Sequence, residues 1–95
     1  MIIMVKKKKF NAASVPIYAL ESDDYGLTKK QEIAVWQHGV DSGQVWHLQG
    51  WYGRNAAAML EDGTLHFPKK QTFDAYGNPI PTQAQMKKRK KMERL

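Results

Sequence analysis

Charge is unevenly distributed along this 95-residue chain, and its distribution limits where a core can form. Residues 1–9 carry four lysines, residues 10–68 carry three basic and seven acidic side chains, and residues 69–95 carry eight basic and two acidic ones. All three tryptophans lie in the central segment. Because clustered like charges repel one another and stay in water, we expect a basic N-terminal arm (1–9), a compact body (10–68) and an extended, proline-containing arm that ends in a basic helix (69–95).

Composition restricts the class of protein further. Hydrophobic residues make up 42% of the chain and aromatic residues 11%, which is typical of a folded protein. The absence of cysteine excludes a disulfide framework and a thiolate zinc site. No apolar run approaches the length of a bilayer span, and Met1–Val5 is too short for a signal peptide, so we expect a cytoplasmic protein with no membrane partner.

The body is short for a stable monomer. A domain of about 60 residues buries only about 60% of the surface of its unfolded chain. Homo-oligomerisation or binding to a partner would increase that burial, and the sequence leaves both open.

The first helix of the body is predicted over residues 29–39. Thr28 and Gln31 have the spacing of a capping box, in which each side chain binds the backbone N–H of the other residue. Gly39 and the Asp41–Gly43 segment are typical of a helix end. The residues between them place one apolar stripe on the helix, at Ile33, Trp36 and Val40.

The second helical stretch, residues 45–61, is predicted as one helix or two. As one helix, it buries Trp46 and Tyr52 and leaves a third stripe facing water, at His47, Trp51, Arg54, Ala58 and Glu61. Gly50 and Gly53 each disfavour a helix interior by about 1 kcal/mol, so a break between them is the alternative. Whether Trp51 is a core or a contact residue depends on that choice.

The remaining segments favour short strands and extended chain. Residues 15–20 have strand composition, but Pro16 limits them to an edge strand or an extended lead-in, which could pair with a short strand at 64–67. The turn residues of 69–81 predict an extended arm. Thr82 and Gln85 again have capping-box spacing, which predicts a basic helix over 83–94. We therefore expect an α+β, mostly helical, small single domain with two or three central helices, a short two-stranded element and basic terminal arms.

Residues able to carry out catalysis are few. There is no cysteine nucleophile, phosphate-binding loop or nucleophile elbow. His38, His47 and His66 are too scattered for a local metal motif, and the acidic pairs Asp23-Asp24 and Glu61-Asp62 suit solvation or capping. We expect no enzyme, no metal and no cofactor.

Two lysine-rich runs indicate contacts with nucleic-acid phosphates, with solvated ends as the alternative. They are Lys6-Lys7-Lys8-Lys9 and Lys87-Lys88-Arg89-Lys90-Lys91. Gly50-Trp51-Tyr52-Gly53 also has the G-x-x-G pattern of a KH-domain loop, although with aromatic residues at its centre. Ala34, Gly39 and Val45 lie near helix-turn-helix positions, with one residue more than the usual spacing.

A second candidate surface combines His47, Trp51 and Arg54. Tryptophan and arginine are enriched at the centres of protein interfaces. If the one-helix phase holds, these three side chains form an exposed partner-binding patch.

Two segments of the chain, residues 46–63 and 73–81, contain the runs Trp46-His47-Leu48-Gln49-Gly50-Trp51-Tyr52-Gly53-Arg54 and Phe73-Asp74-Ala75-Tyr76-Gly77-Asn78-Pro79. These segments resemble parts of small uncharacterised proteins of tailed bacteriophages. The resemblance covers about a third of the chain. It implies a viral, intracellular setting, and it supplies no activity and no catalytic residue that could be transferred to this chain.

Three functions are compatible with these features. The first is a non-enzymatic, nucleic-acid-associated protein that uses its basic arms on phosphates. The second is an inhibitor or adaptor that binds a host protein of nucleic-acid metabolism through the His47, Trp51 and Arg54 patch. The third is a minor structural or assembly protein.

Overall fold

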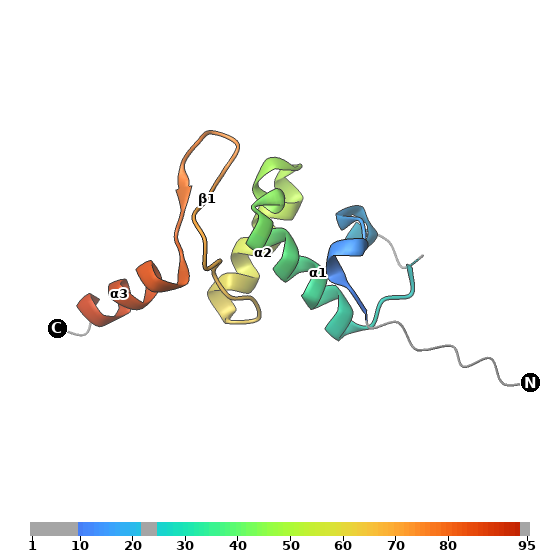
Figure 1. Ribbon diagram of the computed structural model, residues 1–95, viewed down its shortest axis with the longest axis horizontal. Helices are drawn as coiled ribbons and strands as arrows, with labels where there is room; N and C mark the ends of the chain where they lie inside the picture. Colours follow the sequence, from blue (N-terminus) through green and yellow to red (C-terminus); the bar gives the residue numbers. More distant parts are fainter. Residues whose placement is uncertain (1–9, 22–24, 94–95) are drawn as a thin grey trace, which may run out of the picture.

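The computed structural model describes residues 10–21 and 25–93 of the chain, and Figure 1 shows their course. It confirms a small, mostly helical α+β domain. Its elements are η1 (Ala12–Ser14), η2 (Ile17–Glu21), α1 (Lys29–Ser42), η4 (Gln44–His47), α2 (Gly50–Asp62), β1 (Thr72–Phe73), β2 (Pro79–Ile80) and α3 (Gln83–Glu93).

The predicted start of α1 is confirmed. Thr28 Oγ1 accepts from the Gln31 backbone N–H at 3.1 Å, and the Gln31 side chain accepts from the Thr28 N–H at 3.0 Å. The helix continues past Gly39, the predicted end, and stops at Gly43, which has φ of 82°. Gly39 is buried against η4, so its missing side chain serves close packing inside the helix rather than termination.

Residues 45–61 form two helical segments, but the break precedes both glycines. The 3-10 turn η4 ends at His47, Leu48 is extended with ψ of −176°, and α2 begins at Gly50. Gly50 and Gly53 therefore lie in the first turn of α2. Most backbone N–H groups of a first turn have no intrahelical acceptor, so glycines there weaken few helical hydrogen bonds. Helix α2 ends at Gly63, which adopts φ of 88° as a left-handed cap.

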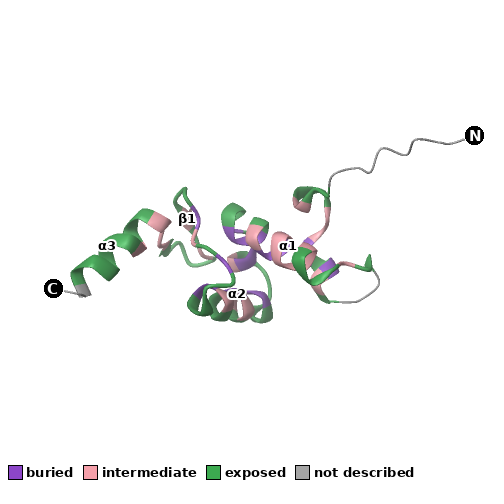
Figure 2. Cartoon of the chain, turned by 90° about the horizontal axis from the view of Figure 1, so that it is seen from below, coloured by how far each residue is buried: buried purple, intermediate pink, exposed green. Residues whose placement is uncertain are grey.

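The core forms where η2, α1, η4 and α2 meet (Figure 2). Of the stripe predicted on α1, Trp36 and Val40 are buried and Ile33 is half-buried, while Val35, which lies outside that stripe, is buried as well. The buried cluster consists of Ile17, Trp36, Val40, Val45, Tyr52, Ala56, Leu60 and Leu65. Trp46 is half-buried beside it, and Trp51 is exposed.

The predicted strands at residues 15–20 and 64–67 are wrong. Residues 17–21 form a 3-10 helix, in which the Ala19 N–H donates to the Pro16 carbonyl. In the other segment, both backbone groups of His66 bind the Gln37 side chain of α1, at 2.9 and 2.8 Å. The Gln37 side chain thus satisfies the backbone groups that a neighbouring strand would bind in a sheet. Leu65, the residue before His66, is buried.

The two-stranded element lies instead within residues 69–81, which were expected as an extended arm. Strands β1 and β2 pair antiparallel, with Thr72 opposite Ile80 and Phe73 opposite Pro79. A hydrogen bond of 2.8 Å joins His47 Nε2 to the Phe73 carbonyl, which ties the hairpin to η4. The arm is therefore folded back on the body.

The basic helix predicted over residues 83–94 is present as α3, Gln83–Glu93. Its capping box is confirmed, because Thr82 Oγ1 accepts from the Gln85 N–H at 3.3 Å and the Gln85 side chain accepts from the Thr82 N–H at 3.0 Å. Helix α3 lies at the opposite end of the molecule from η1 and η2 (Figure 1). None of the described helices is long and apolar enough to cross a membrane.

Candidate nucleic-acid interface

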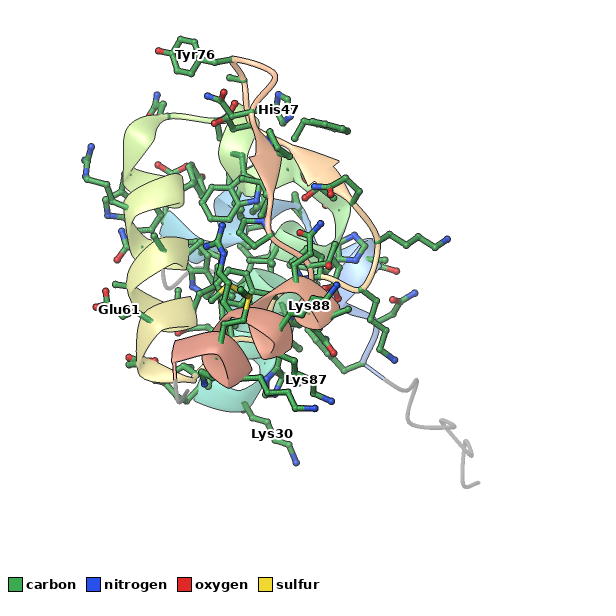
Figure 3. All side chains as sticks on the ribbon, turned by 90° about the vertical axis from the view of Figure 1, so that its left-hand side faces the viewer. Lys30, His47, Glu61, Tyr76, Lys87 and Lys88 are labelled. Carbon is green, nitrogen blue, oxygen red and sulfur yellow. The ribbon has the colours of Figure 1, made fainter. Side chains whose placement is uncertain are left out.

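The structure places five consecutive cationic side chains on α3. Successive residues of an α-helix are 100° apart, so five in a row reach all sides of the helix. All five are exposed: Lys87, Lys88, Arg89, Lys90 and Lys91. Figure 3 shows Lys87 and Lys88 on α3, well separated from Tyr76 at the tip of the hairpin. The other predicted run, Lys6–Lys9, lies outside the described residues.

Two further lysines, which the sequence reasoning did not include in the site, lie at the base of α3. Lys69 and Lys70 are exposed and directly follow Pro68, whose carbonyl accepts from the Gln83 N–H at 2.9 Å. Both lysines line a hollow with Gln83 at the start of α3. Their signal in the sequence was the charge of residues 69–95, since they belong to the same basic segment.

The carboxylate nearest in sequence to these lysines is engaged in the hairpin turn. Asp74 Oδ1 accepts from the Tyr76 and Asn78 backbone N–H groups, each at 2.9 Å. The Asn78 hydrogen bond is the main reason that the Asp74 pKa lies below its usual value, with smaller contributions from Tyr76 and His47. Residues 69–92 thus carry seven cationic side chains and a single carboxylate. That carboxylate, Asp74, is used to stabilise the hairpin turn.

Asp62, at the end of α2, has a structural role of the same kind. Its Oδ1 accepts from the Thr64 backbone N–H at 2.8 Å. Hydrogen bonds from Thr64 hold the pKa of Asp62 below its usual value. Asp62 therefore stabilises the loop that follows α2.

Trp51 lies on the surface, beside the core. The residue is 39% exposed, and its ring contacts those of Trp36 and Tyr52, with centroid separations of 5.6 and 5.0 Å. The Tyr52 hydroxyl donates to Glu21 of η2. Burial, reinforced by that hydrogen bond and by the Glu21 charge, raises the pKa of Tyr52 to about 12.

The structure does not place His47 on one helix face with Trp51 and Arg54. His47 belongs to η4 and binds the hairpin, because the chain breaks at Leu48. Arg54 folds back over Gly50, where a Cβ atom would lie 2.7 Å from Arg54 Nη1. Trp51 and Arg54 remain exposed in the first half of α2, whereas His47 belongs with the hairpin.

The two nucleic-acid motifs considered for the body are contradicted. Gly50–Gly53 lies in the first turn of α2, whereas a KH motif needs these residues in a loop between helices. Seven residues, 43–49, separate α1 from α2 and include a 3-10 turn, whereas a helix-turn-helix has a turn of three or four residues. Within the described ranges, no group of three His, Asp or Glu side chains is placed to hold a metal ion.

Fold and surface together define a small α+β domain with a cationic C-terminal helix. The chain belongs to a family described as a domain of unknown function, DUF7417, whose model matches residues 12–77. The match covers the body and the first strand of the hairpin, and it ends before β2 and α3. No curated protein and no solved structure matches the chain. The family description names neither a source nor an activity, so the resemblance to tailed-phage proteins stays a prediction.

Proposed function

We propose that the protein binds nucleic acid without catalysis, through phosphate contacts of α3 and the lysines at its base. The observation that carries the proposal is the clustering of seven exposed cations, five of them consecutive in α3, at one end of the molecule. A polyanion binds such a surface because each lysine or arginine that meets a phosphate releases a condensed counterion. The predicted contribution of Lys6–Lys9 belongs to the same proposal.

The geometry favours binding to the backbone over reading of sequence. Helix α3 has exposed cations on all sides, and within residues 83–92 it has no buried side chain. Long, flexible lysine side chains act as point charges toward phosphate and carry little base discrimination. We therefore expect similar affinity for different sequences and a steep dependence on salt.

Fluorescence-anisotropy titrations of labelled duplex DNA, single-stranded DNA and RNA test this proposal. We expect the double variant Lys88→Gln/Lys91→Gln to weaken binding and to lower the slope of log K against log salt by up to about 2, the number of phosphate contacts removed. The matched control is Lys29→Gln/Lys30→Gln, which removes the same charge from exposed positions in the first turn of α1. Equal losses in both variants, or no binding at low salt, would contradict a site on α3.

Trp51 supports a second candidate function, binding to a host protein of nucleic-acid metabolism. The observation in its favour is an exposed tryptophan beside an exposed arginine, Arg54, on α2. Trp51→Ala should then abolish capture of that partner while the circular-dichroism spectrum stays native. Either function would place the chain in the cytoplasm, that of an infected host if the protein is encoded by a phage.

A further inference from the structure

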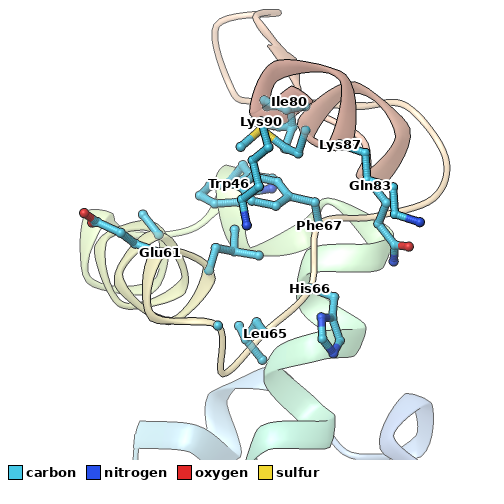
Figure 4. Close-up of a pocket in the computed structure, with 14 residues that line it drawn as sticks. Trp46, Glu61, Leu65, His66, Phe67, Ile80, Gln83, Lys87 and Lys90 are labelled. Carbon is cyan, nitrogen blue, oxygen red and sulfur yellow. The ribbon is translucent and has the colours of Figure 1, made fainter. Parts of the chain in front are cut away.

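A groove of about 610 Å³ separates α2 from α3 (Figure 4). Its lining is mostly apolar and comes from four parts of the chain: η4, the second half of α2, the loop after α2, and the segment from β2 into α3. The apolar side chains that line it include Trp46, Leu60, Leu65, Phe67, Ile80 and Met86. Cavities of 300–1,000 Å³ with such walls are typical of ligand sites.

The two walls of the groove carry side chains of opposite charge. Lys87 and Lys90 line it on the α3 side, whereas Glu61 lines it on the α2 side (Figure 4). The other three cations of the run, including Lys88 and Lys91, do not line it. The cationic run of α3 is therefore divided between a groove face and an outer face.

The dimensions suit a short peptide. Gln83 and Lys90, which both line the groove, are seven residues apart, or about 10 Å along α3 at 1.5 Å per residue. That length accommodates about two turns of a helical segment. Large apolar side chains spaced three or four residues apart would reach the floor of the groove from one face of such a segment.

The lining suits a peptide better than a nucleic acid. The apolar walls, which include the rings of Trp46 and Phe67, offer few hydrogen bonds to base edges, and Glu61 on the α2 wall repels a phosphate backbone. A peptide can place its carboxylates beside Lys87 and Lys90 and keep the opposite side neutral. Charge and apolar surface together thus select an acidic, amphipathic segment.

We propose that this groove binds a short acidic amphipathic peptide segment of a partner protein. Its apolar side chains lie on the floor formed by Leu60, Leu65 and Phe67, and its carboxylates pair with Lys87 and Lys90. This site goes beyond phosphate binding, because the outer face of α3 stays free for a second ligand. The two functions can therefore be lost separately.

The alanines of α2 provide a steric test. Ala57 and Ala58 are both exposed, but only Ala57 lines the groove. Ala57→Phe fills the groove, and Ala58→Phe adds the same ring to the helix surface outside it. A displayed library of random peptides of about twelve residues, or about three helical turns, is selected on the full chain, and synthetic copies of the enriched peptides are titrated by anisotropy.

We expect enriched peptides to be acidic, with large apolar residues three or four apart. Ala57→Phe should weaken their binding by about tenfold or more and Ala58→Phe by less than about twofold. Lys87→Glu/Lys90→Glu should abolish peptide binding, whereas Lys88→Glu/Lys91→Glu should spare it and weaken binding of labelled DNA. Loss of DNA binding in the outer-face variant with intact peptide binding would separate the two proposals.

Several outcomes would overturn the peptide site. They are enrichment of no peptide, enrichment of basic or uncharged peptides, and equal effects of Ala57→Phe and Ala58→Phe. If Ala57→Phe instead abolishes binding of a single-stranded oligonucleotide, the groove holds a base. If the variant dissociates an oligomer measured by sedimentation, the groove holds a second copy of the chain.

Discussion

Gly39 and Gly53 are both helical glycines, yet they face different surroundings. A Cβ atom at Gly39 would lie 2.6 Å from Val45 Cγ1 and 2.9 Å from Ile17 Cδ1. At Gly53 the nearest atom would be Trp46 Cε3, at an ordinary 3.7 Å. The first glycine lets α1 approach η2 and η4, whereas the second leaves room for a methyl group.

We therefore predict opposite effects of the same substitution. Gly39→Ala should lower the free energy of unfolding by about 1–3 kcal/mol, because the added methyl overpacks the core. Gly53→Ala should raise that free energy by about 0.5 kcal/mol, because alanine loses less backbone entropy than glycine on entering a helix, even in its first turn. Urea unfolding measures both, and Val45→Ala should partly rescue Gly39→Ala. A stabilised Gly39→Ala variant would show that the contact between α1 and η4 is looser than the structure indicates.

The hydrogen bond between Tyr52 and Glu21 predicts alkaline behaviour. Because the pKa of Tyr52 is raised from 10.0 to about 12 in the folded state, its contribution to stability is complete below pH 10 and is lost as the pH rises through about 12. Tyr52→Phe should remove a step near pH 12 from the phenolate absorbance titration and cost about 1 kcal/mol at neutral pH.

Glu21→Gln separates the two causes of that shift. Burial is the larger cause and the Glu21 hydrogen bond and charge are the smaller ones, so the Tyr52 pKa should fall in this variant but stay above 10. A return to 10 would assign the whole shift to Glu21.

At the scale of elements, the hairpin depends on side-chain hydrogen bonds at its turn. Each strand has two residues, too few for a ladder that is stable on its own. Asp74 supplies acceptors to the backbone of Tyr76 and Asn78, and Gly77 adopts φ of 81°. His47 then holds the hairpin against η4 through the Phe73 carbonyl.

This arrangement predicts that acid weakens the hairpin. The pKa of Asp74 lies below 3.8 in the folded state, so the stabilisation is complete above the unfolded value and is lost as the pH falls through the lowered one. Amide hydrogen exchange of Asn78 should accelerate, relative to an unfolded peptide, across that range. In Asp74→Asn, which keeps one oxygen acceptor but cannot ionise, this acid-dependent part should vanish; a persistent dependence would assign it to another group.

At the scale of the whole molecule, the described part of the chain consists of a core and an attached charged helix. Every buried apolar side chain of the described residues lies between residues 17 and 68, whereas α3 contacts the rest of the chain through half-buried side chains such as Gln83 and Met86. Stability and proposed function therefore reside in different parts of the chain.

A chain shortened to residues 1–82 should thus fold. We predict cooperative urea unfolding with a loss of less than about 1 kcal/mol, since no core residue is removed. Binding to nucleic acid should weaken and its salt dependence should flatten. A shortened chain that unfolds without cooperativity would mean that α3 is part of the core.

The start of α1, the start of α3 and the apolar stripe of α1 could be predicted because their causes are local. A capping box joins residues three apart, and helical periodicity repeats within a single turn. The charge of residues 69–95, which underlies the candidate interface, is likewise visible without coordinates. Local signals failed where a distant residue supplied the hydrogen bond or the packing surface.

Three tertiary contacts explain the features of the fold that the sequence did not predict. Gln37 binds the backbone of His66, which replaces a strand there, and Val45 packs on Gly39, which lets α1 continue. His47 binds the Phe73 carbonyl of the hairpin, so it does not share a surface with Trp51 and Arg54 as predicted. The groove between α2 and α3 is also a tertiary property, because its walls come from segments that only folding brings together. Long-range contacts form after chain closure, so no local pattern in the sequence records them.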